Sequence, residues 1–355
     1  MELILPLLVA FIISYISIWF SKPIAVELGL VDIPNSRKLH MGTVPLVGGI
    51  AIFFGVLTST SIFMLNNQYL NIYLVASALV VFIGVLDDFY DLPVRPRIVA
   101  QVIAACFMIY GANISVINLG DLFGFGVVSL GVLSSIFTVI AVVASINAFN
   151  MVDGIDGLVG MLSLVTFIAL TYLLYVADHN WLLLSSTFIA ATIAYLIFNL
   201  GWVKHKRKKV FMGDAGSMLI GFSILWLLVV GSQGSAPAFK PITALWLVSV
   251  PVMDMAAIMV RRIKKGQSPF KPDRDHLHHI FLRAGLSSKQ TLIFITLIAL
   301  GLTFLGIFLE YLETPDWLML SIFLFIFICY SYAITHIWRF LAFYRRFRVK
   351  GRKVE

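Results

Sequence analysis

Long apolar blocks dominate the chain, and short polar breaks separate them. Each block is roughly 16–22 residues long, the length that an α-helix needs to cross the hydrocarbon layer of a membrane. The blocks have no polar face, so they do not suit a soluble core, whose helices meet water on one side. We therefore predict an all-α, polytopic integral membrane protein with about eleven transmembrane helices. These are expected at residues 3–21, 44–65, 71–86, 97–112, 126–146, 157–176, 182–200, 214–231, 240–260, 291–310 and 317–337.

The composition and the basic residues agree with this division. Of the residues, 60% are hydrophobic and only 12% are charged, about half the usual ~25%. Lys and Arg concentrate in cytoplasmic loops, and with alternating loops one side holds all of the 26 Lys and Arg residues except Lys240. The pattern predicts an external N-terminus, a cytoplasmic C-terminus and one transmembrane domain over residues 1–355. The basic tail at 338–355 favours anionic lipid headgroups over a nucleic acid.

Acidic residues gather where the predicted spans end on the cytoplasmic side. Asp87, Asp88 and Asp91 follow the third span. Adjacent carboxylates repel one another and are stabilised by a cation between them. Alternatively, these acids could simply lie at the solvated end of a helix. Their position at a basic membrane face favours a functional role.

A second polar run follows the fifth span. Asn147 and Asn150 are three residues apart, so they lie on one face of a helix end. Asp153 and Asp156 come next, each followed by a glycine that permits sharp turns and close approach to a ligand. The spacing is not that of an EF-hand, and a plain turn would explain the glycines but not the paired Asn and Asp. We interpret this run as part of a binding site.

The segment before the eighth span carries Phe211 and Asp214. An acid at the start of a helix is a common N-cap. The same position suits a magnesium ligand, because Mg²⁺ takes one or two carboxylates together with phosphate oxygens. The preceding basic run, 204–209, is interpreted mainly as a topology signal.

Three histidines, His276, His278 and His279, lie between the ninth and tenth spans. Their number suggests zinc, but structural zinc sites normally use two separated ligand pairs. Beside Arg262 and Arg274 they favour a phosphate or diphosphate site. The buried acid Asp254 is expected to support a neighbouring residue and not to be a catalyst.

The loop after the first span adds Lys38 and His40, followed by the twin glycines Gly48 and Gly49. Glycines at a helix start permit either close helix packing or close approach of a ligand, and the sequence leaves both interpretations open.

Four motifs in this order resemble the polyprenyl-phosphate N-acetylhexosamine-1-phosphate transferases over nearly the whole chain. They are DDFYD at 87–91, NAFNMVDGIDG at 147–157, FMGDAGS at 211–217 and HLHH at 276–279. Details such as the HLHH run are similar to the bacterial branch that acts on undecaprenyl phosphate. The resemblance implies that GlcNAc-1-phosphate passes from UDP-GlcNAc to undecaprenyl phosphate, with release of UMP. It also implies Mg²⁺ as the cofactor, with Mn²⁺ as the alternative.

The resemblance assigns a role to each candidate residue. Asp214 would hold the metal, with Asn150 and Asp88 as further ligands. Asp87, Asp88, Asp153, Asp156 and His276 would be catalytic, the first two beside the lipid phosphate and metal and the next two in the nucleotide-sugar pocket. Phe211 would lie near the uracil, and Arg262 and His276 near the diphosphate or sugar. The remaining substrate-binding residues would be Lys38, His40, Asn147, Arg274, His278 and His279.

The implied setting is the inner membrane of a bacterium, with the active site on the cytoplasmic face and a homodimer as one assembly that the family allows. The product would begin a lipid-linked surface polysaccharide such as an O-antigen or common antigen. The alternatives are a relative that uses another UDP-N-acetylhexosamine, a CDP-alcohol phosphotransferase or a secondary transporter. A transporter should carry charges and broken helices near the bilayer midplane, whereas these acids collect at one face.

Overall fold

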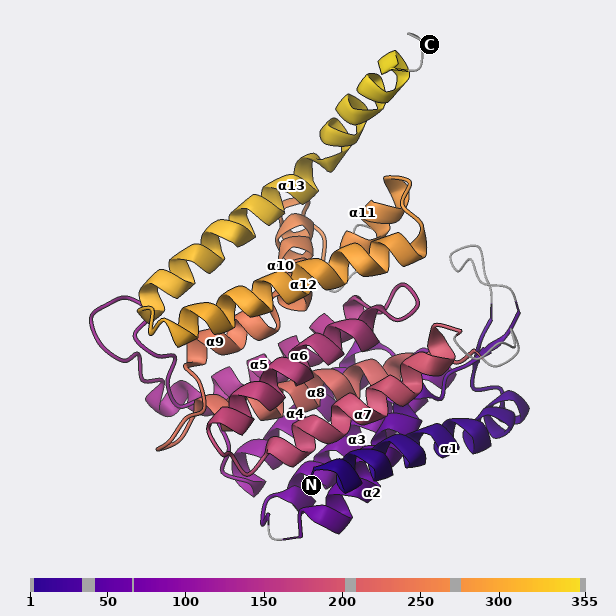
Figure 1. Ribbon diagram of the computed structural model, residues 1–355, viewed down its shortest axis with the longest axis vertical. Helices are drawn as coiled ribbons and strands as arrows, with labels where there is room; N and C mark the ends of the chain where they lie inside the picture. Colours follow the sequence, from indigo (N-terminus) through magenta and orange to yellow (C-terminus); the bar gives the residue numbers. More distant parts are fainter. Residues whose placement is uncertain (1–2, 34–41, 66, 202–208, 269–275, 352–355) are drawn as a thin grey trace.

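A computed structural model describes residues 3–33, 42–65, 67–201, 209–268 and 276–351, with side chains described as far as residue 336. Helices make up most of the described chain (Figure 1). A single small antiparallel pair, β1 (Val31–Asp32) with β2 (Val44–Pro45), lies among these residues. The helices are α1 (Ile4–Leu28), α2 (Gly48–Phe63), α3 (Leu70–Tyr90), α4 (Val94–Cys106), α5 (Ser134–Met151), α6 (Leu158–Val176), α7 (Leu182–Asn199), α8 (Gly213–Ser232), α9 (Pro241–Leu247), α10 (Ser249–Lys264), α11 (Leu277–Arg283), α12 (Ser288–Tyr311) and α13 (Asp316–Gly351).

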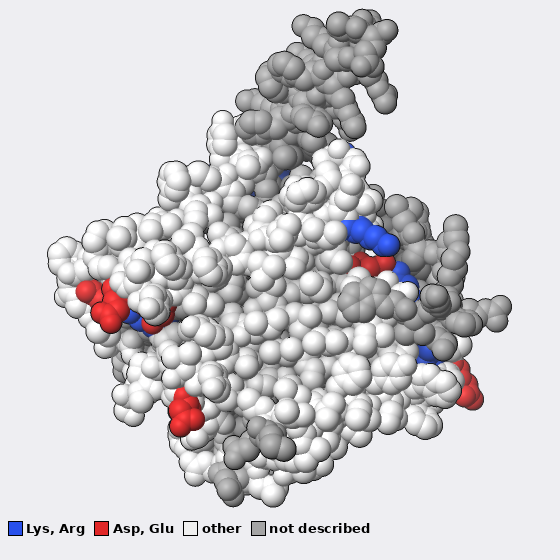
Figure 2. All heavy atoms as spheres, viewed as in Figure 1, with Lys and Arg blue, Asp and Glu red and all other residues white. Residues whose placement is uncertain are grey.

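The helices have the lengths and apolar character of membrane spans. Within the described residues, nine helical segments can cross a membrane by length and hydropathy, and the bent pair α9–α10 raises this number to ten. The apolar α2 has 16 residues and is shorter. Figure 2 shows a broad band almost free of charge between two charged ends. The all-α membrane architecture is thus confirmed, while the count of eleven spans and the orientation stay predictions.

Several predicted boundaries differ from the structure by a few residues, for example at the end of α1, and two differences matter for the site and the tail. The span expected at 126–146 begins five residues later, with a 3₁₀ turn at Gly131–Leu133 that leads into α5. The cause is a local loop, because Asn118 pairs with Ser129 and the Val128 amide donates to the Gly120 carbonyl. The shift places Asn147 and Asn150 in the last turns of α5. At the other end, α13 continues as a helix to Gly351 through most of the predicted tail.

The span expected at 240–260 is broken into α9 and α10, which meet at an angle of 82° around Val248. Pro251 explains the break, because it has no N–H to donate to the Leu247 carbonyl one helical turn earlier. The Thr166 hydroxyl of α6 donates to that carbonyl instead, at 2.9 Å. A neighbouring helix therefore satisfies the backbone group that the proline leaves open.

Replacing Thr166 with valine should remove this hydrogen bond at nearly constant volume. We expect a loss of about 1 kcal/mol in stability, the scale of hydrogen bonds between membrane helices, measured as a lower melting temperature in detergent. Thr187→Val is the matched control, because the buried Thr187 hydroxyl bonds only to the Leu184 carbonyl of its own helix. Equal effects of the two substitutions would show that the hydroxyl does not stabilise the bend.

Helix α8 forms the centre of the bundle, and 89% of its span is buried. It contacts α2, α3, α5 and α6. A Cβ at Gly49 of α2 would overlap the backbone of Gly216, and a Cβ at Gly84 of α3 would overlap Ala215. The Gly49 amide also donates to the Met212 carbonyl at 3.0 Å. Gly49 of the twin pair and Gly84 therefore permit close packing, which brings α2 and α3 against the start of α8.

Candidate active site

Asp88 accepts hydrogen bonds from the first turn of α8. The Asp214 amide donates to Asp88 Oδ1 at 2.8 Å, and the Ala215 amide donates to Oδ2 at 3.3 Å. The residue that precedes α8, Met212, provides no side-chain cap. Asp88, which belongs to α3, thus caps the N-terminus of α8 by accepting hydrogen bonds from its free amides. This contact joins the motif at 87–91 to the motif at 211–217. Gly213 is required between them, because its φ is +71° and a Cβ there would overlap the Asp88 carboxylate.

Asp87 is buried beside the same helix start and is held by two donors. Arg97 Nη1 lies 2.8 Å from Asp87 Oδ2, and the Leu92 amide donates to Oδ1 at 2.8 Å. The carboxyl groups of Asp87 and Asp214 are close enough to interact directly. Arg97 was not among the predicted site residues, because it was counted only as a topology signal. Its place ten residues after Asp87, in a loop with only one other basic residue, was the available clue.

The two asparagines of α5 point to different partners. Asn150 Nδ2 donates to Asp214 Oδ1 at 2.7 Å and to Ser217 Oγ at 3.0 Å. Asn150 is therefore part of the acidic cluster, as its predicted role requires. Asn147 Nδ2 instead donates to Gln101 Oε1 at 2.9 Å, which ties α5 to α4. Gln101 is a buried polar residue that sequence reasoning did not single out.

The acidic cluster fits a divalent cation. Asp87, Asp88 and Asp214 bring three carboxylates together, and Arg97 is the basic side chain bonded to them within the described residues. No three His, Cys, Asp or Glu side chains in this part of the chain are already arranged around one point as metal ligands. Mg²⁺ itself needs few protein carboxylates, because it completes its shell with water and phosphate oxygens. Asp214 and Asn150, which are joined by a hydrogen bond of 2.7 Å, are the residues that could hold such an ion.

A second group of side chains lies between the loop after α5 and the segment before α8. Lys209 Nζ lies 2.6 Å from Asp156 Oδ2 and 5.0 Å from the centre of the Phe211 ring. Asp156 and Phe211, which are predicted to bind the nucleotide sugar, are therefore neighbours. Lys209 was missed because it ends a basic run that was assigned to topology.

The histidine segment, His276–His279, packs against the loop after α5. His276 Nδ1 lies 2.8 Å from Asp254 Oδ2, which confirms that Asp254 supports a neighbouring side chain. His278 is buried, and its Nε2 faces Gly154, where a Cβ would overlap it. Burial lowers the pKa of His278 to about 3, and its two histidine neighbours add to the effect. This ring is therefore neutral at physiological pH, so it does not offer a positive charge to a phosphate.

Known proteins are similar in sequence to nearly the whole chain. The chain is 44% identical over 352 residues to the undecaprenyl-phosphate alpha-N-acetylglucosaminyl 1-phosphate transferase of Yersinia pestis, covering 98% of this chain and 95% of that protein. Proteins of the same name from Salmonella typhi and Pasteurella multocida are each 42% identical, over 97% and 99% of the chain and 94% and 99% of their own lengths. The profile of glycosyl transferase family 4 matches residues 70–232.

The chain belongs to glycosyl transferase family 4.

This membership confirms the resemblance to the polyprenyl-phosphate N-acetylhexosamine-1-phosphate transferases. The matched family region holds Asp87, Asp88, Asn150 and Asp214, which the structure brings together. The matched region ends before Arg262 and the histidines. Arg262 is buried in the last turn of α10. The rings of His278 and His279 lie side by side, with their centroids 4.2 Å apart. The predicted site residues Lys38, His40 and Arg274 lie outside the described residues.

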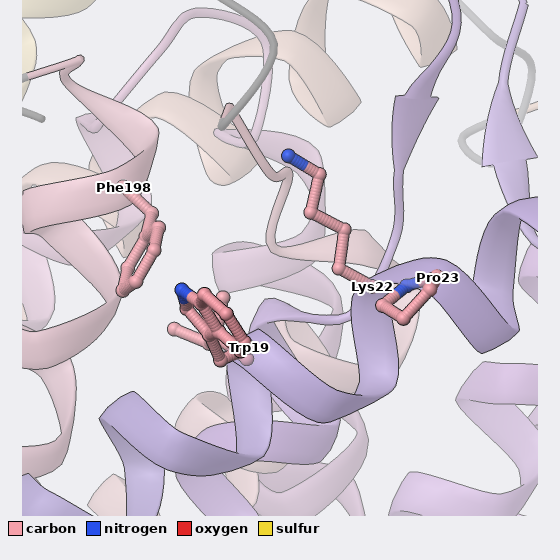
Figure 3. A pocket seen from close by; sticks show the side chains of 5 residues that line it. Trp19, Lys22, Pro23 and Phe198 are labelled. Carbon is pink, nitrogen blue, oxygen red and sulfur yellow. The ribbon is translucent and has the colours of Figure 1, made fainter. Parts of the chain in front are cut away.

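A pocket of about 260 Å³ lies between α1 and α7 (Figure 3). Apolar atoms form most of its wall, and Lys22 is the charged residue that lines it. Its lining includes none of the predicted site residues that the structure describes. Its lining residues are Ile18, Trp19, Lys22, Pro23 and Phe198.

Proposed function

We propose that this chain transfers GlcNAc-1-phosphate from UDP-GlcNAc to undecaprenyl phosphate. The products are UMP and undecaprenyl-diphospho-GlcNAc. The observation that carries the proposal is the near full-length match to three transferases whose names specify that lipid phosphate and that sugar phosphate. The cluster of Asp87, Asp88 and Asp214 at one end of a membrane bundle supports it, because two anionic substrates can react only where a cation offsets their charge.

The reaction is an in-line displacement at phosphorus. An oxygen of the lipid phosphate forms a bond to the β-phosphorus of UDP-GlcNAc, and the bond from that phosphorus to the bridging oxygen breaks. UMP leaves with the electron pair of that bond. Such transfers depend on positioning and charge more than on covalent chemistry. Mg²⁺, held by Asp214 and Asn150, would neutralise the diphosphate and the departing UMP.

The protein's own groups divide the remaining work. Arg97 orients Asp87 at 2.8 Å and carries further N–H donors suited to the lipid phosphate. A phosphate monoester with a second pKa of ~6 is already mostly dianionic at neutral pH, so Asp87 has only to orient the nucleophile or accept a residual proton. Asp153, Asp156, Lys209 and Phe211 form the nucleotide-sugar side of the site, and His276 with Arg262 meets the diphosphate or sugar.

Direct attack by the lipid phosphate is favoured over a route through a phospho-aspartate. In the direct reaction, UMP forms only when the acceptor is present. Purified protein mixed with UDP-GlcNAc and Mg²⁺ alone should therefore release no stoichiometric burst of UMP. A burst equal to the enzyme concentration would establish the two-step route.

The distribution of basic residues supports a membrane orientation. The described site end of the bundle carries Arg97, Lys209 and Arg262, whereas Lys240 lies beyond the far end of α9. Basic loops stay in the cytoplasm, so we place the site on the cytoplasmic face of a bacterial inner membrane, the N-terminus outside and eleven spans in all. The lipid-linked product would then feed surface polysaccharide assembly.

The test is a donor panel on purified protein in detergent. Undecaprenyl phosphate and Mg²⁺ are combined with UDP-GlcNAc, UDP-GalNAc or UDP-MurNAc-pentapeptide, and UMP is measured with and without EDTA. We expect UMP from UDP-GlcNAc only when metal and lipid are both present. Release from another donor alone would change the assigned sugar, and no release from any donor by folded protein would refute the transferase assignment.

Replacing Lys209 with methionine should raise the KM for UDP-GlcNAc about 10-fold, equivalent to ~1.4 kcal/mol, with a smaller effect on kcat. The substitution keeps the apolar stem but removes the charge that joins Asp156 to the Phe211 ring. Initial rates over a range of donor concentrations measure it. Lys289→Met is the matched control, because Lys289 is exposed at the start of α12. An unchanged KM in the Lys209 variant would remove this residue from the donor site.

A further inference from the structure

The buried carboxylate of Asp254 receives three hydrogen bonds from outside its own helix. His276 Nδ1 lies 2.8 Å from Oδ2, and the Leu277 amide donates to Oδ1 at 3.0 Å. The third donor is the Tyr330 hydroxyl of α13, at 2.9 Å from Oδ1. Asp254 is 1% exposed, so each missing donor would leave part of a buried charge unsatisfied.

These contacts determine how the His276 ring is held. Because Nδ1 is committed to Asp254, Nε2 is the nitrogen that remains for a substrate. The His276 ring is stacked on His278 with an interplanar angle of 5° and a centroid distance of 5.8 Å. His278 in turn packs against Gly154 in the loop that carries Asp153 and Asp156. A continuous series of contacts therefore runs from α13 to the nucleotide-sugar side of the site.

We propose that Tyr330 is a positioning residue for His276, acting through Asp254. The last long helix of the chain would thereby be a functional part of the active site. Tyr330 lies 76 residues from Asp254 and well outside the matched family region, 70–232. In the part of α13 whose side chains are described, Asp316–His336, 17% of the membrane-spanning window is buried. Tyr330 is half-buried and directs its hydroxyl inward.

The inference rests on the proposed transfer from UDP-GlcNAc. A loosely held side chain that is displaced by about 1 Å can cost roughly 10²-fold in rate. Removing only the Tyr330 hydroxyl leaves Asp254 bonded to His276 and Leu277, so the loss in rate should be smaller than this. We expect Tyr330→Phe to lower kcat roughly 10-fold and to change the KM for UDP-GlcNAc less than about 2-fold.

The experiment measures UMP release by Tyr330→Phe in parallel with Tyr332→Phe. Tyr332 lies two residues away on the same helix and is exposed, so its variant should match wild type. Activity is expressed per folded protein, with the melting temperature measured for each variant. A kcat within 2-fold of wild type for Tyr330→Phe would overturn the proposal. So would a loss that disappears when activity is corrected for the amount of folded protein.

A double substitution separates positioning from a general structural effect. In an Asp254→Asn background the relay is already altered, so adding Tyr330→Phe should reduce kcat by less than about 2-fold further. The same roughly 10-fold factor in both backgrounds would show that Tyr330 does not act through Asp254. Failure of the proposed function is recognised separately, because wild-type protein would then release no UMP in the donor panel.

Discussion

Asp214→Asn should lower UMP release about 10²–10³-fold, the scale of losing one electrostatic contact that stabilises a transition state, without lowering the melting temperature. Asparagine has nearly the same shape and keeps an oxygen for Asn150 Nδ2, which lies 2.7 Å from Asp214 Oδ1. The substitution removes a partly buried negative charge that faces Asp87 and Asp88. Relief of this repulsion favours the folded protein when no metal is bound, whereas the loss of charge weakens Mg²⁺ binding.

Two measurements test this expectation on the same sample. UMP release is titrated with Mg²⁺, and the melting temperature is recorded in EDTA. Asp178→Asn is the matched control, because Asp178 lies in the turn between α6 and α7 at the other end of the bundle. Its φ of +49° is one that asparagine adopts readily. Wild-type activity and Mg²⁺ dependence in Asp214→Asn would contradict the metal assignment.

Hydropathy predicted the helices well because a membrane imposes both their length and their apolar surface. It did not predict the break at Val248. Pro251 leaves a carbonyl without its helical donor, and the residue that donates to it, Thr166, is 81 positions away in the sequence. The late start of α5 was missed for a similar reason, because the residues before it are apolar enough for a helix but pair with one another in a loop.

The candidate site was predictable where charge stands out against an apolar background. Asp87, Asp88, Asn150 and Asp214 were identified in this way, and the structure brings them together. Arg97 and Lys209 were missed because basic residues at a membrane face already have an explanation in topology. Tyr330 gave no signal, since one tyrosine in an apolar helix is ordinary. Its partner is revealed only by the packing of α13 against α10.

Asp88 is predicted from sequence to be a catalytic residue and metal ligand, and the structure gives it a second role that mutation can separate. Both of its carboxylate oxygens accept amide hydrogen bonds from α8. In Asp88→Asn one of these oxygens becomes an NH₂ group that faces another N–H donor. We expect a loss of ~1.5–3 kcal/mol in stability, the scale of a hydrogen bond to a charged group, and a large loss of UMP release because Asp214 moves with the start of α8.

The comparison with Asp214→Asn is decisive, because the two substitutions remove the same charge a short distance apart. If Asp88 caps the start of α8, activity and melting temperature should fall together in Asp88→Asn. In Asp214→Asn only activity should fall. Asp91→Asn is the control within the same motif, since Asp91 is exposed at the end of α3 and its φ of +48° suits asparagine. If Asp88→Asn instead loses activity with an unchanged melting temperature, the carboxylate acts on the metal or the lipid phosphate, and the start of α8 is held by its glycine contacts with α2 and α3.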